Sequence, residues 1–430
     1  MRKVYNIHNH MCEIQNHGKM ASHQPNALFI WYNCSIAILR IVMIKRKVIL
    51  LRRVKTVAVI SDIVMPTVRS EYLIGIAKYA QARQDLSIRC IDVKNVKSGN
   101  SLGGCDGVIL DTDDKKVLEI VSASDLPVVD TTCSTENPNF IRVDNDVKAA
   151  SVMAAEWFLG RGFKNFAYCG VSPDDADYFA ATVAKAGHGC LIYDEEKLTR
   201  KKPTTDHLPR LLAGLKAWVP KLPTNTAVLC SNDIRALHIL DTCLKLGRSV
   251  PDDIAIMGQY NDIAVCTCSP VTMTSIDSDI QGVSHAAMRI LDAAMRRPFK
   301  RKLRPPLLIP PIGIVEREST ATYPVKPSWI AKTLLLLDAN LDKQISAKDL
   351  ARAAGVSQTA LQKAFHKTFA KSIGKYITSL KMRTARRLFN DEGLSVKEVS
   401  SRTGFSSPNY FCHVYQAFYG HPPSADRRKR

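Results

Sequence analysis

Polar side chains that can read nucleic-acid bases occur in two groups near the end of this 430-residue chain. The first group is Ser357, Gln358, Thr359, Gln362 and Lys363, and the second is Ser407, Asn409, His413 and Gln416. In the major groove of DNA, Gln and Asn pair with adenine, Lys contacts guanine or a phosphate, and Ser and Thr adapt to either. We therefore expect both groups to bind DNA.

Two similar segments carry these groups. Residues 347–369 and 396–418 each contain a short helical pattern, a glycine, a serine and a second helical pattern. Gly355 and Gly404 lie at the turns, where a tight corner between helices needs the positive φ that glycine adopts easily. The serine can cap the helix that follows it. An internal repeat is stronger evidence than a single motif match, and it predicts two helix-turn-helix units.

The second helix of each unit has an apolar stripe and a polar face. The apolar stripes are Leu361, Ala364 and Phe365, then Phe411, Val414 and Tyr415. They must pack on the first helices through Leu350 and Val399, which leaves the polar faces free to enter the major groove. Ser395 and Glu398 have the spacing of a capping box that starts the second unit.

A helix expected over residues 376–389 joins the two units. It is rich in basic side chains, namely Lys381, Arg383, Arg386 and Arg387. We expect Arg383 and Arg387 to contact DNA phosphates. A stiff helix here would hold the two reading helices about 34 Å apart, which is one turn of DNA.

Residues 329–430 resemble the AraC-type DNA-binding domain. The match rests on the two turn glycines, the pattern Arg383-x-Ala385-x-x-Leu388, the run 404–411 and the ending Phe418-x-Gly420-x-x-Pro423. Asp426 stands where that family usually has an aromatic residue, which is expected to weaken packing of the last turn.

Two aspartates in the middle of the chain follow apolar strand-like runs. Asp62 follows the run 56–61, and Asp233 follows 226–230 by a short turn. Open α/β sheets bind ligands beyond the carboxyl ends of their strands, and a carboxylate accepts two hydrogen bonds from sugar hydroxyls. The alternative role for each Asp is to cap the next helix.

Strands and helices alternate over this region. Apolar runs occur at 56–61, 107–110, 127–130, 166–169, 226–230 and 254–258, with helical patterns at 71–84, 146–160 and 233–246. This alternation predicts parallel sheets covered by helices. The length of the region indicates two α/β lobes, at 55–320, followed by a proline-containing linker at 321–328.

The region 55–320 resembles the periplasmic-binding-protein-like domain of LacI-type repressors. The matching segments are 143–145, 160–163, 231–233, 250–258, 269–270 and 274–277. The combination with an AraC-type domain resembles the xylose operon regulator family. It implies a two-lobed α/β domain plus an all-α tandem helix-turn-helix domain. It also places Asn232, Asp233 and Asp277 in the ligand cleft, with Asp62 from the other lobe.

Two departures from that family concern the ligand. The stretch 172–189 contains no Arg where the family has an Arg-bearing helix, and Tyr260-Asn261-Asp262 replaces Asp-Asn-Asp. The cleft is therefore expected to be narrower or more apolar, and the effector need not be xylose.

The charge is concentrated at the two ends of the chain. The net charge is +20, of which residues 330–430 supply +11 and residues 1–54 supply +8. A basic end indicates an acidic partner such as nucleic acid, although a solvated surface gives the same pattern. The twelve Cys are scattered without zinc-site spacing, as in a reducing cytoplasm.

Residues 1–54 are interpreted as an extension outside the fold, with Met43 as the natural start. The alternative is a membrane anchor formed by the apolar stretch 27–44, although Asn33, Ser35 and Arg40 interrupt it.

We expect a cytoplasmic transcription regulator in which a small sugar closes the two lobes. The expected partners are double-stranded DNA, the sugar effector and a second copy of the chain, with RNA polymerase as a further candidate. No cofactor, metal, catalytic residue or membrane is expected. A sugar-processing enzyme and a transport binding protein are the alternatives, but the chain lacks the G-x-S-x-G, phosphate-loop and H-E-x-x-H patterns of enzymes.

Overall fold

The computed structural model describes residues 41–44, 47–50, 54–63, 65–83, 85–133, 136–194, 207–296, 305–343, 345–391 and 393–426. The chain divides into two compact units, Met1–Val54 and Lys55–Arg430. In the first unit, β1 (Ile41–Ile44) and β2 (Lys47–Leu50) pair antiparallel. The expectations for residues 1–40 lie outside the described residues.

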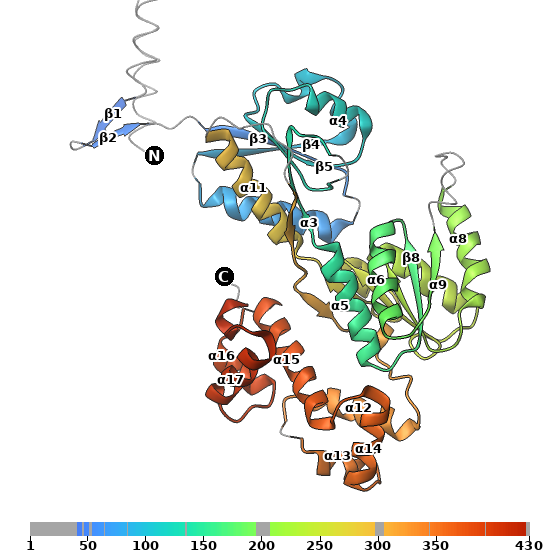
Figure 1. Ribbon diagram of the computed structural model, residues 1–430. Coiled ribbons are helices and arrows are strands. Elements are labelled where there is room, and N and C mark those ends of the chain that lie inside the picture. Colours follow the sequence, from blue (N-terminus) through green and yellow to red (C-terminus); the bar gives the residue numbers. More distant parts are fainter. Residues whose placement is uncertain are drawn as a thin grey trace, which may run out of the picture. The chain divides into compact units, whose positions relative to one another are not determined.

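The second unit begins with two α/β lobes, each built on a six-stranded sheet (Figure 1). The sheet of lobe 1 has the order β13 (Leu307–Ile309), β7 (Phe140–Asn145), β6 (Val128–Asp130), β5 (Gly107–Asp111), β3 (Lys55–Ser61), β4 (Leu86–Asp92). The helices of lobe 1 are α3 (Pro66–Gln81), α4 (Lys115–Ser122) and α11 (Ile280–Arg296). All strand pairs in this sheet are parallel.

Lobe 2 has the same plan. The order of its sheet is β14 (Gly313–Val315), β12 (Thr274–Asp277), β11 (Ile254–Gln259), β10 (Thr226–Cys230), β8 (Asn165–Gly170), β9 (Cys190–Asp194). Its helices are α5 (Val147–Gly160), α6 (Pro173–Lys185), α8 (His207–Trp218), α9 (Asp233–Lys245) and α10 (Ile263–Thr267). Within the described strands of this sheet, β14 runs antiparallel to β12 and the other pairs are parallel.

Helices cover both faces of each sheet, which explains the continuous apolar strands. In β3, Val57 packs into the core on one face and Ala58 into the core on the other. In β10, Ala227 packs into the core on one face of the sheet and Val228 into the core on the other. Since neither face meets water, alternation of polar and apolar residues is absent, as expected for parallel sheets.

The predicted strands and helices are confirmed with small shifts of their ends. The strands that were not predicted are short, lie at sheet edges or carry polar residues: β4, β7, β9, β12, β13 and β14. In β4, for example, Ser87 and Arg89 are exposed because β4 is an edge strand.

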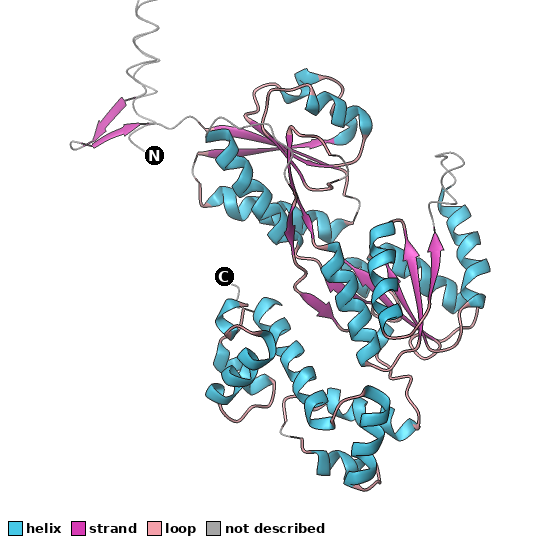
Figure 2. Cartoon of the chain, viewed as in Figure 1, coloured by secondary structure: helices cyan, strands magenta, loops and turns pink. Residues whose placement is uncertain are grey.

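The last part of the chain is all helical where the structure describes it (Figure 2). The helices are α12 (Ser328–Asp338), α13 (Ala347–Ala353), α14 (Gln358–Phe369), α15 (Ile373–Asp391), α16 (Val396–Arg402) and α17 (Pro408–Tyr419). The long helix α15 belongs to two cores: Tyr376 and Leu380 pack with α12–α14, whereas Met382 and Phe389 pack with α16 and α17. Two helix groups are therefore joined by one shared helix.

The segment 321–328 is more tightly packed than the expected linker. Tyr323 is 3% exposed and Val325 is 8% exposed, and both belong to the core that α12–α14 form. A Cβ on Gly162 of lobe 2 would lie 2.4 Å from a methyl carbon of Val325. The segment 321–328 is therefore packed between lobe 2 and the helical domain, where its apolar side chains are buried.

Candidate ligand cleft and nucleic-acid interface

The carboxyl ends of the lobe 1 strands bring several carboxylates together. Asp111 ends β5, Asp130 ends β6, and Asp62 follows β3. Asp111 accepts hydrogen bonds from Ser61 Oγ at 3.1 Å and Thr131 Oγ1 at 3.0 Å. Adjacent parallel strands end at the same sheet edge, so these polar groups face the space where such sheets bind ligands.

Lobe 2 contributes a second polar group. Asp175 lies in the first turn of α6, and Gln259 ends β11. Asp175 accepts hydrogen bonds from Ser151 Oγ at 3.3 Å, Tyr168 Oη at 3.4 Å and Gln259 Nε2 at 3.4 Å. These long contacts hold the carboxylate in place and leave it capacity for a stronger donor.

A cavity of about 10 Å³, which is room for one water molecule, lies beside the lobe 2 group at the points where the chain crosses between the lobes. Its lining residues are Asn145, Asp146, Val147, Ala150, Asp175, Gln259, Tyr260, Ser278 and Pro311. The segments at Asn145, Ser278 and Pro311 connect elements of lobe 1 with elements of lobe 2. Ligand contacts here would touch both lobes and their hinge.

The cleft carboxyl groups are unusually hard to ionise. Burial is the main cause that raises the pKa of Asp111, Asp144 and Asp175 to about 6. For Asp111 and Asp144, the neighbouring carboxylate of Asp130 raises it further. None of the ion pairs formed within the described residues includes these three groups. The cleft thus holds carboxylates that lack a compensating cation.

Asp233, which was expected to bind ligand, is inside lobe 2. Its side chain is fully buried, and its Oδ2 accepts the backbone N–H of Asp262 at 2.7 Å. Burial raises its pKa to about 7. Asp262 in turn accepts the backbone N–H of Thr67, in lobe 1, at 3.1 Å. The contacts of Asp233 therefore organise the loop that touches the other lobe.

The other three expected ligand residues have different surroundings. Asn232 caps α9 by accepting the backbone N–H of Arg235 at 2.8 Å. Asp277 accepts the backbone N–H of Asp279 at 3.1 Å, at a crossing between the lobes. Asp62 is exposed, and its carboxylate accepts a hydrogen bond of 2.7 Å from Thr112 Oγ1. The structure thus gives Asn232 the capping role, while Asp62 and Asp277 lie at strand ends.

Sequence reasoning missed Asp111, Asp175 and Gln259, but it did single out Tyr260 as a residue that narrows the cleft. The rule that selected Asp62 also applies to Asp111, which directly follows the predicted strand 107–110. Tyr260 has φ 87°, a conformation rare for a large side chain. Burial is the main cause that raises its pKa, and the carboxylates of Asp175 and Asp144, one from each lobe, raise it further. Its side chain lines the small cavity at the crossings between the lobes.

The two helix-turn-helix units have the expected local geometry. Gly355 and Gly404 have φ of 67° and 66°. The Ser357 side chain caps α14 by accepting a hydrogen bond from the backbone N–H of Ala360. The Ser407 side chain caps α17 by accepting one from the backbone N–H of Tyr410. The capping box at Ser395 and Glu398 is present, as is one at Ser346 and Asp349 that was not predicted. These caps satisfy N–H groups that would otherwise lack partners at the helix starts.

Each reading helix buries its apolar stripe and exposes its polar face. Leu361, Phe365, Phe411 and Tyr415 have no exposed surface. The exposed polar residues are Gln358, Thr359, Gln362, Lys363, Asn409, His413 and Gln416. Tyr410, 61% exposed on the same face of α17, was not predicted. An aromatic residue among the polar positions of this helix is a signal that sequence reasoning could have used.

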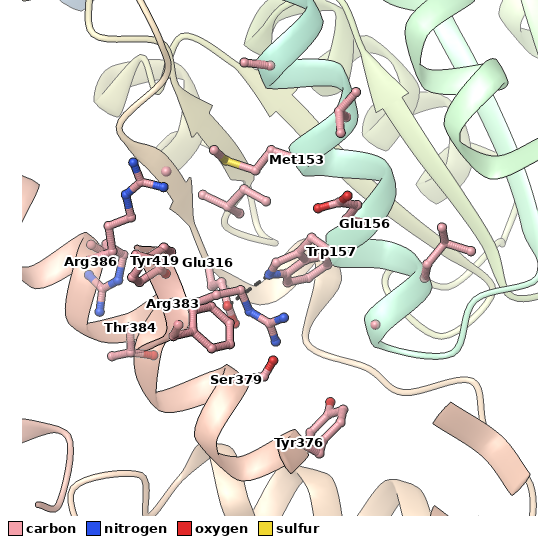
Figure 3. A pocket seen from close by; sticks show the side chains of 18 of the residues that line it. Met153, Glu156, Trp157, Glu316, Tyr376, Ser379, Arg383, Thr384, Arg386 and Tyr419 are labelled. Carbon is pink, nitrogen blue, oxygen red and sulfur yellow. Dashed lines mark hydrogen bonds between the residues drawn. The ribbon is translucent and has the colours of Figure 1, made fainter. Parts of the chain in front are cut away.

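Arg383 and Arg387, which are expected to contact DNA phosphates, both line a cavity. It has a volume of about 780 Å³ and lies between α15 and lobe 2 (Figure 3). The opposite wall includes Met153 and Trp157 of α5 and Glu316 beyond β14. In this arrangement the two arginines face lobe 2.

Asp426 does not leave the last turn unsupported. Its Oδ2 accepts a hydrogen bond of 2.6 Å from the Tyr415 hydroxyl and lies 3.3 Å from Arg386 Nε. Polar contacts to a buried tyrosine thus stand where the aromatic packing of the family would be, and the expectation of weaker packing in the last turn stays a prediction.

Within the described residues, no group of three or more His, Cys, Asp or Glu is placed to hold a metal ion. The same residues include no helix long and apolar enough to span a membrane.

Comparisons with known proteins find similarity for both parts of the chain. Residues 155–320 match the model of a periplasmic binding protein-like domain, and residues 350–429 match that of a helix-turn-helix domain. The xylose operon regulatory protein of Escherichia coli (strain K12) is 26% identical over 341 residues, which are 75% of this chain and 83% of that protein. The protein of the same name from Haemophilus influenzae is 22% identical over 82% of this chain and 93% of its own length.

Solved structures share the fold. The structure of a xylose-binding transcription activator matches with a TM-score of 0.53 and 22% identity, over 87% of this chain and 98% of its own. A transcriptional regulator in complex with cellobiose matches with a TM-score of 0.50 and 18% identity, over 72% of this chain and 94% of its own. The order of the domains and the two-lobed plan therefore agree along most of the chain.

Proposed function

We propose that this chain, a transcription regulator homologous to the xylose operon regulatory proteins, binds a small sugar between its two lobes and thereby changes how its tandem helix-turn-helix domain binds DNA. The observation that carries the proposal is the joining of two exposed base-reading helix faces to a cleft of buried carboxylates in a single chain. Xylose or a related pentose is the first candidate effector, since the relatives named above are xylose operon regulators.

The ligand contacts are proposed at the strand ends that face the cleft. Asp111 and Asp62 would contact the sugar from lobe 1, and Asp175, Gln259 and Asp277 from lobe 2 and the crossings. Carboxylates accept sugar hydroxyls in charge-assisted hydrogen bonds, and an amide can both donate and accept. Asn232 and Asp233 would act indirectly, by fixing the start of α9 and the loop at Asp262.

Tyr260 favours a sugar over a linear polyol. It lines the cavity at the crossings together with Asp175 and Gln259. An aromatic ring offers a flat apolar surface to the C–H face of a sugar while its hydroxyl remains able to hydrogen-bond. A pocket narrowed by this ring suits a monosaccharide better than a disaccharide.

The same geometry accounts for closure. Hydrogen bonds already join the lobes, from Thr67 N–H to Asp262 and from Ala264 N–H to Thr67 Oγ1 at 3.4 Å. A ligand held by both lobes would stabilise the closed arrangement, in proportion to its preference for that state. A second copy of the chain would then be held with its DNA-binding domains at a new spacing, and RNA polymerase is a further candidate partner.

The DNA contacts are proposed for α14 and α17. Gln358, Thr359, Gln362 and Lys363 would read one half of the site. Asn409, His413 and Gln416, with Tyr410 beside them, would read the other half. Ser357 and Ser407 are positioned for phosphates at the helix starts, where backbone N–H groups attract anions.

A thermal-shift panel of pentoses, hexoses and disaccharides on the full chain tests the ligand. A sugar that binds the folded state raises the melting temperature as its concentration passes Kd. We expect a pentose to do so for the natural chain and not for Asp175→Asn, while Arg352→Gln, far from the cleft on an exposed face of α13, responds like the natural chain. A response by a disaccharide alone would contradict the pentose assignment.

A further inference from the structure

The cavity between α15 and lobe 2 has the dimensions of a small-molecule site. Its volume of about 780 Å³ lies in the range of pockets that enclose drug-sized ligands, roughly 300 to 1,000 Å³. One wall comes from α5 and the segment around β14, and the other from α15 and the end of α17 (Figure 3). It is separate from the cleft between the lobes, with which it shares no lining residue.

Positive charge prevails in this cavity. Its cationic lining residues are Lys371, Arg383, Arg386 and Arg387, and its carboxylates are Glu156 and Glu316. Glu316 is already paired with Arg161 and accepts the Trp157 indole N–H at 3.1 Å. Arg383 has no carboxylate within ion-pair distance among the described residues. Figure 3 shows it extending from α15 toward the wall that Trp157 forms.

A buried hydroxyl stands at the cavity wall. Tyr376 is 4% exposed and lines the cavity, and its Oη makes no hydrogen bond of good geometry within the described residues. The Tyr323 hydroxyl lies beside it and already donates to Asp338. The Tyr376 proton is therefore available to the Tyr323 oxygen or to an acceptor on a ligand. Tyr376 lies on the same face of α15 as Arg383, two turns before it.

The remaining walls are apolar and aromatic. Met153 and Ile314 contribute aliphatic surface from lobe 2, and Trp157 and Tyr419 contribute rings. Phe418 is 45% exposed at the rim, which is unusual for a large aromatic side chain. Aromatic ligands gain from offset or edge contacts with such rings.

We propose that this cavity is a second effector site, which takes an organic anion with an aromatic body. Arg383 would hold the acidic group of the ligand in a two-pronged hydrogen bond, and Tyr376 would donate a further hydrogen bond to it. The aromatic body would pack between Trp157 and Phe418. Because the ligand touches both lobe 2 and α15, it would hold the DNA-binding domain against the sugar-binding domain.

The test uses anilinonaphthalene sulfonate, an aromatic anion that becomes fluorescent in apolar surroundings, titrated into the full chain at physiological salt. We expect one saturable site per chain. Arg383→Gln should weaken binding about tenfold, which corresponds to about 1.4 kcal/mol, and Arg383→Lys should weaken it less. Energy transfer from tryptophan to the probe should fall in Trp157→Phe.

Two further variants keep the result interpretable. Tyr376→Phe removes only the hydroxyl at the cavity wall, so the fold should be retained while probe affinity falls a few-fold. Arg352→Gln removes an exposed arginine on α13 and should leave the titration unchanged. Binding that does not saturate, or a dissociation constant that Arg383→Gln leaves unchanged in a chain with a normal melting temperature, would overturn the proposal.

Discussion

Arg161, at the end of α5 in lobe 2, donates a hydrogen bond of 3.4 Å from Nη1 to the Asp338 carboxylate of α12 in the helical domain. The Tyr323 hydroxyl donates to the same Asp338 oxygen at 2.7 Å. The Arg161 guanidinium also lies 4.1 Å from the Trp157 ring centre and 4.5 Å from that of Tyr323. A buried cation, with 5% of its surface exposed, therefore joins lobe 2 to the helical domain.

Removing Arg161 should loosen this junction. In Arg161→Ala, the carboxylate of Asp338 stays largely buried without its cation, and losses of this kind cost about 3 kcal/mol. We expect a lower denaturant midpoint for the helical domain and faster proteolytic cleavage within residues 321–327. Arg161→Lys keeps the charge but loses the stacked planar group. Its denaturant midpoint and cleavage rate should lie between those of Arg161→Ala and the natural chain.

The exposed Arg352 provides the control for that experiment, because its side chain is 75% exposed beside Asp349. Arg352→Gln should unfold like the natural chain. A cleavage rate at 321–327 that is the same in Arg161→Ala and in the natural chain would show that the two halves are not held together by this ion pair.

The raised pKa of Asp233 makes stability depend on pH. Burial lifts this pKa to about 7 from its usual 3.8, so the folded state keeps a proton that the unfolded chain releases. The contribution of Asp233 to the free energy of unfolding should then fall by about 1 kcal/mol per unit as pH rises from about 4 to 7, and should be constant above that.

Asp233→Asn isolates this contribution, since an amide cannot ionise and its oxygen can still accept the N–H of Asp262. The variant should match the natural chain near pH 4 and exceed its stability near pH 8, as measured by urea unfolding across that range. A difference between variant and natural chain that does not vary with pH would rule out this origin of the pH dependence.

The polar support of the last turn should be measurable. Tyr415→Phe removes the hydroxyl that donates 2.6 Å to Asp426 and should lower the free energy of unfolding by about 1 kcal/mol. Asp426→Phe restores the aromatic residue usual in AraC-type domains but leaves the Tyr415 hydroxyl unpaired, so it should also destabilise. If Asp426→Phe is more stable than the natural chain, aromatic packing outweighs the hydrogen bond.

The sequence predicted the elements that local physics determines. Within one short segment, simple rules predicted a turn at Gly355, a helix cap at Ser357 and a buried stripe of Leu361 and Phe365. The structure has all three features. The two lobes could be predicted because a parallel strand such as β10 is apolar on both faces.

The cleft was harder to predict, because it depends on which strand ends meet. Asp233 follows a strand as Asp62 does, yet the contact with Asp262 turns it into the interior of lobe 2. The position of Asp175 depends on α6 lying against Tyr168 of β8 and against Gln259, which is 84 residues away in the sequence. Arg383 looked suited to phosphate, and only the packing of α15 on lobe 2 places it in a cavity.

The reading faces of α14 and α17 should contribute specificity without contributing stability. Asn409 and Gln362 are exposed, so Asn409→Ala and Gln362→Ala should leave the melting temperature unchanged. Loss of a good base contact costs about 1 to 3 kcal/mol, so each variant should bind its preferred duplex at least about tenfold more weakly. Equal affinity of both variants and the natural chain for every duplex tested would remove these side chains from the interface.

The affinity of the full chain for duplex DNA, measured by fluorescence anisotropy across a series of salt concentrations, tests the central claim most directly. Residues 330–430 carry a net charge of +11, and phosphate contacts release counterions from DNA. We predict binding whose log Kd rises steeply with log salt, with a slope that falls by about one in Lys363→Gln. Absence of binding at low salt, or an affinity that does not respond to salt, would contradict the account.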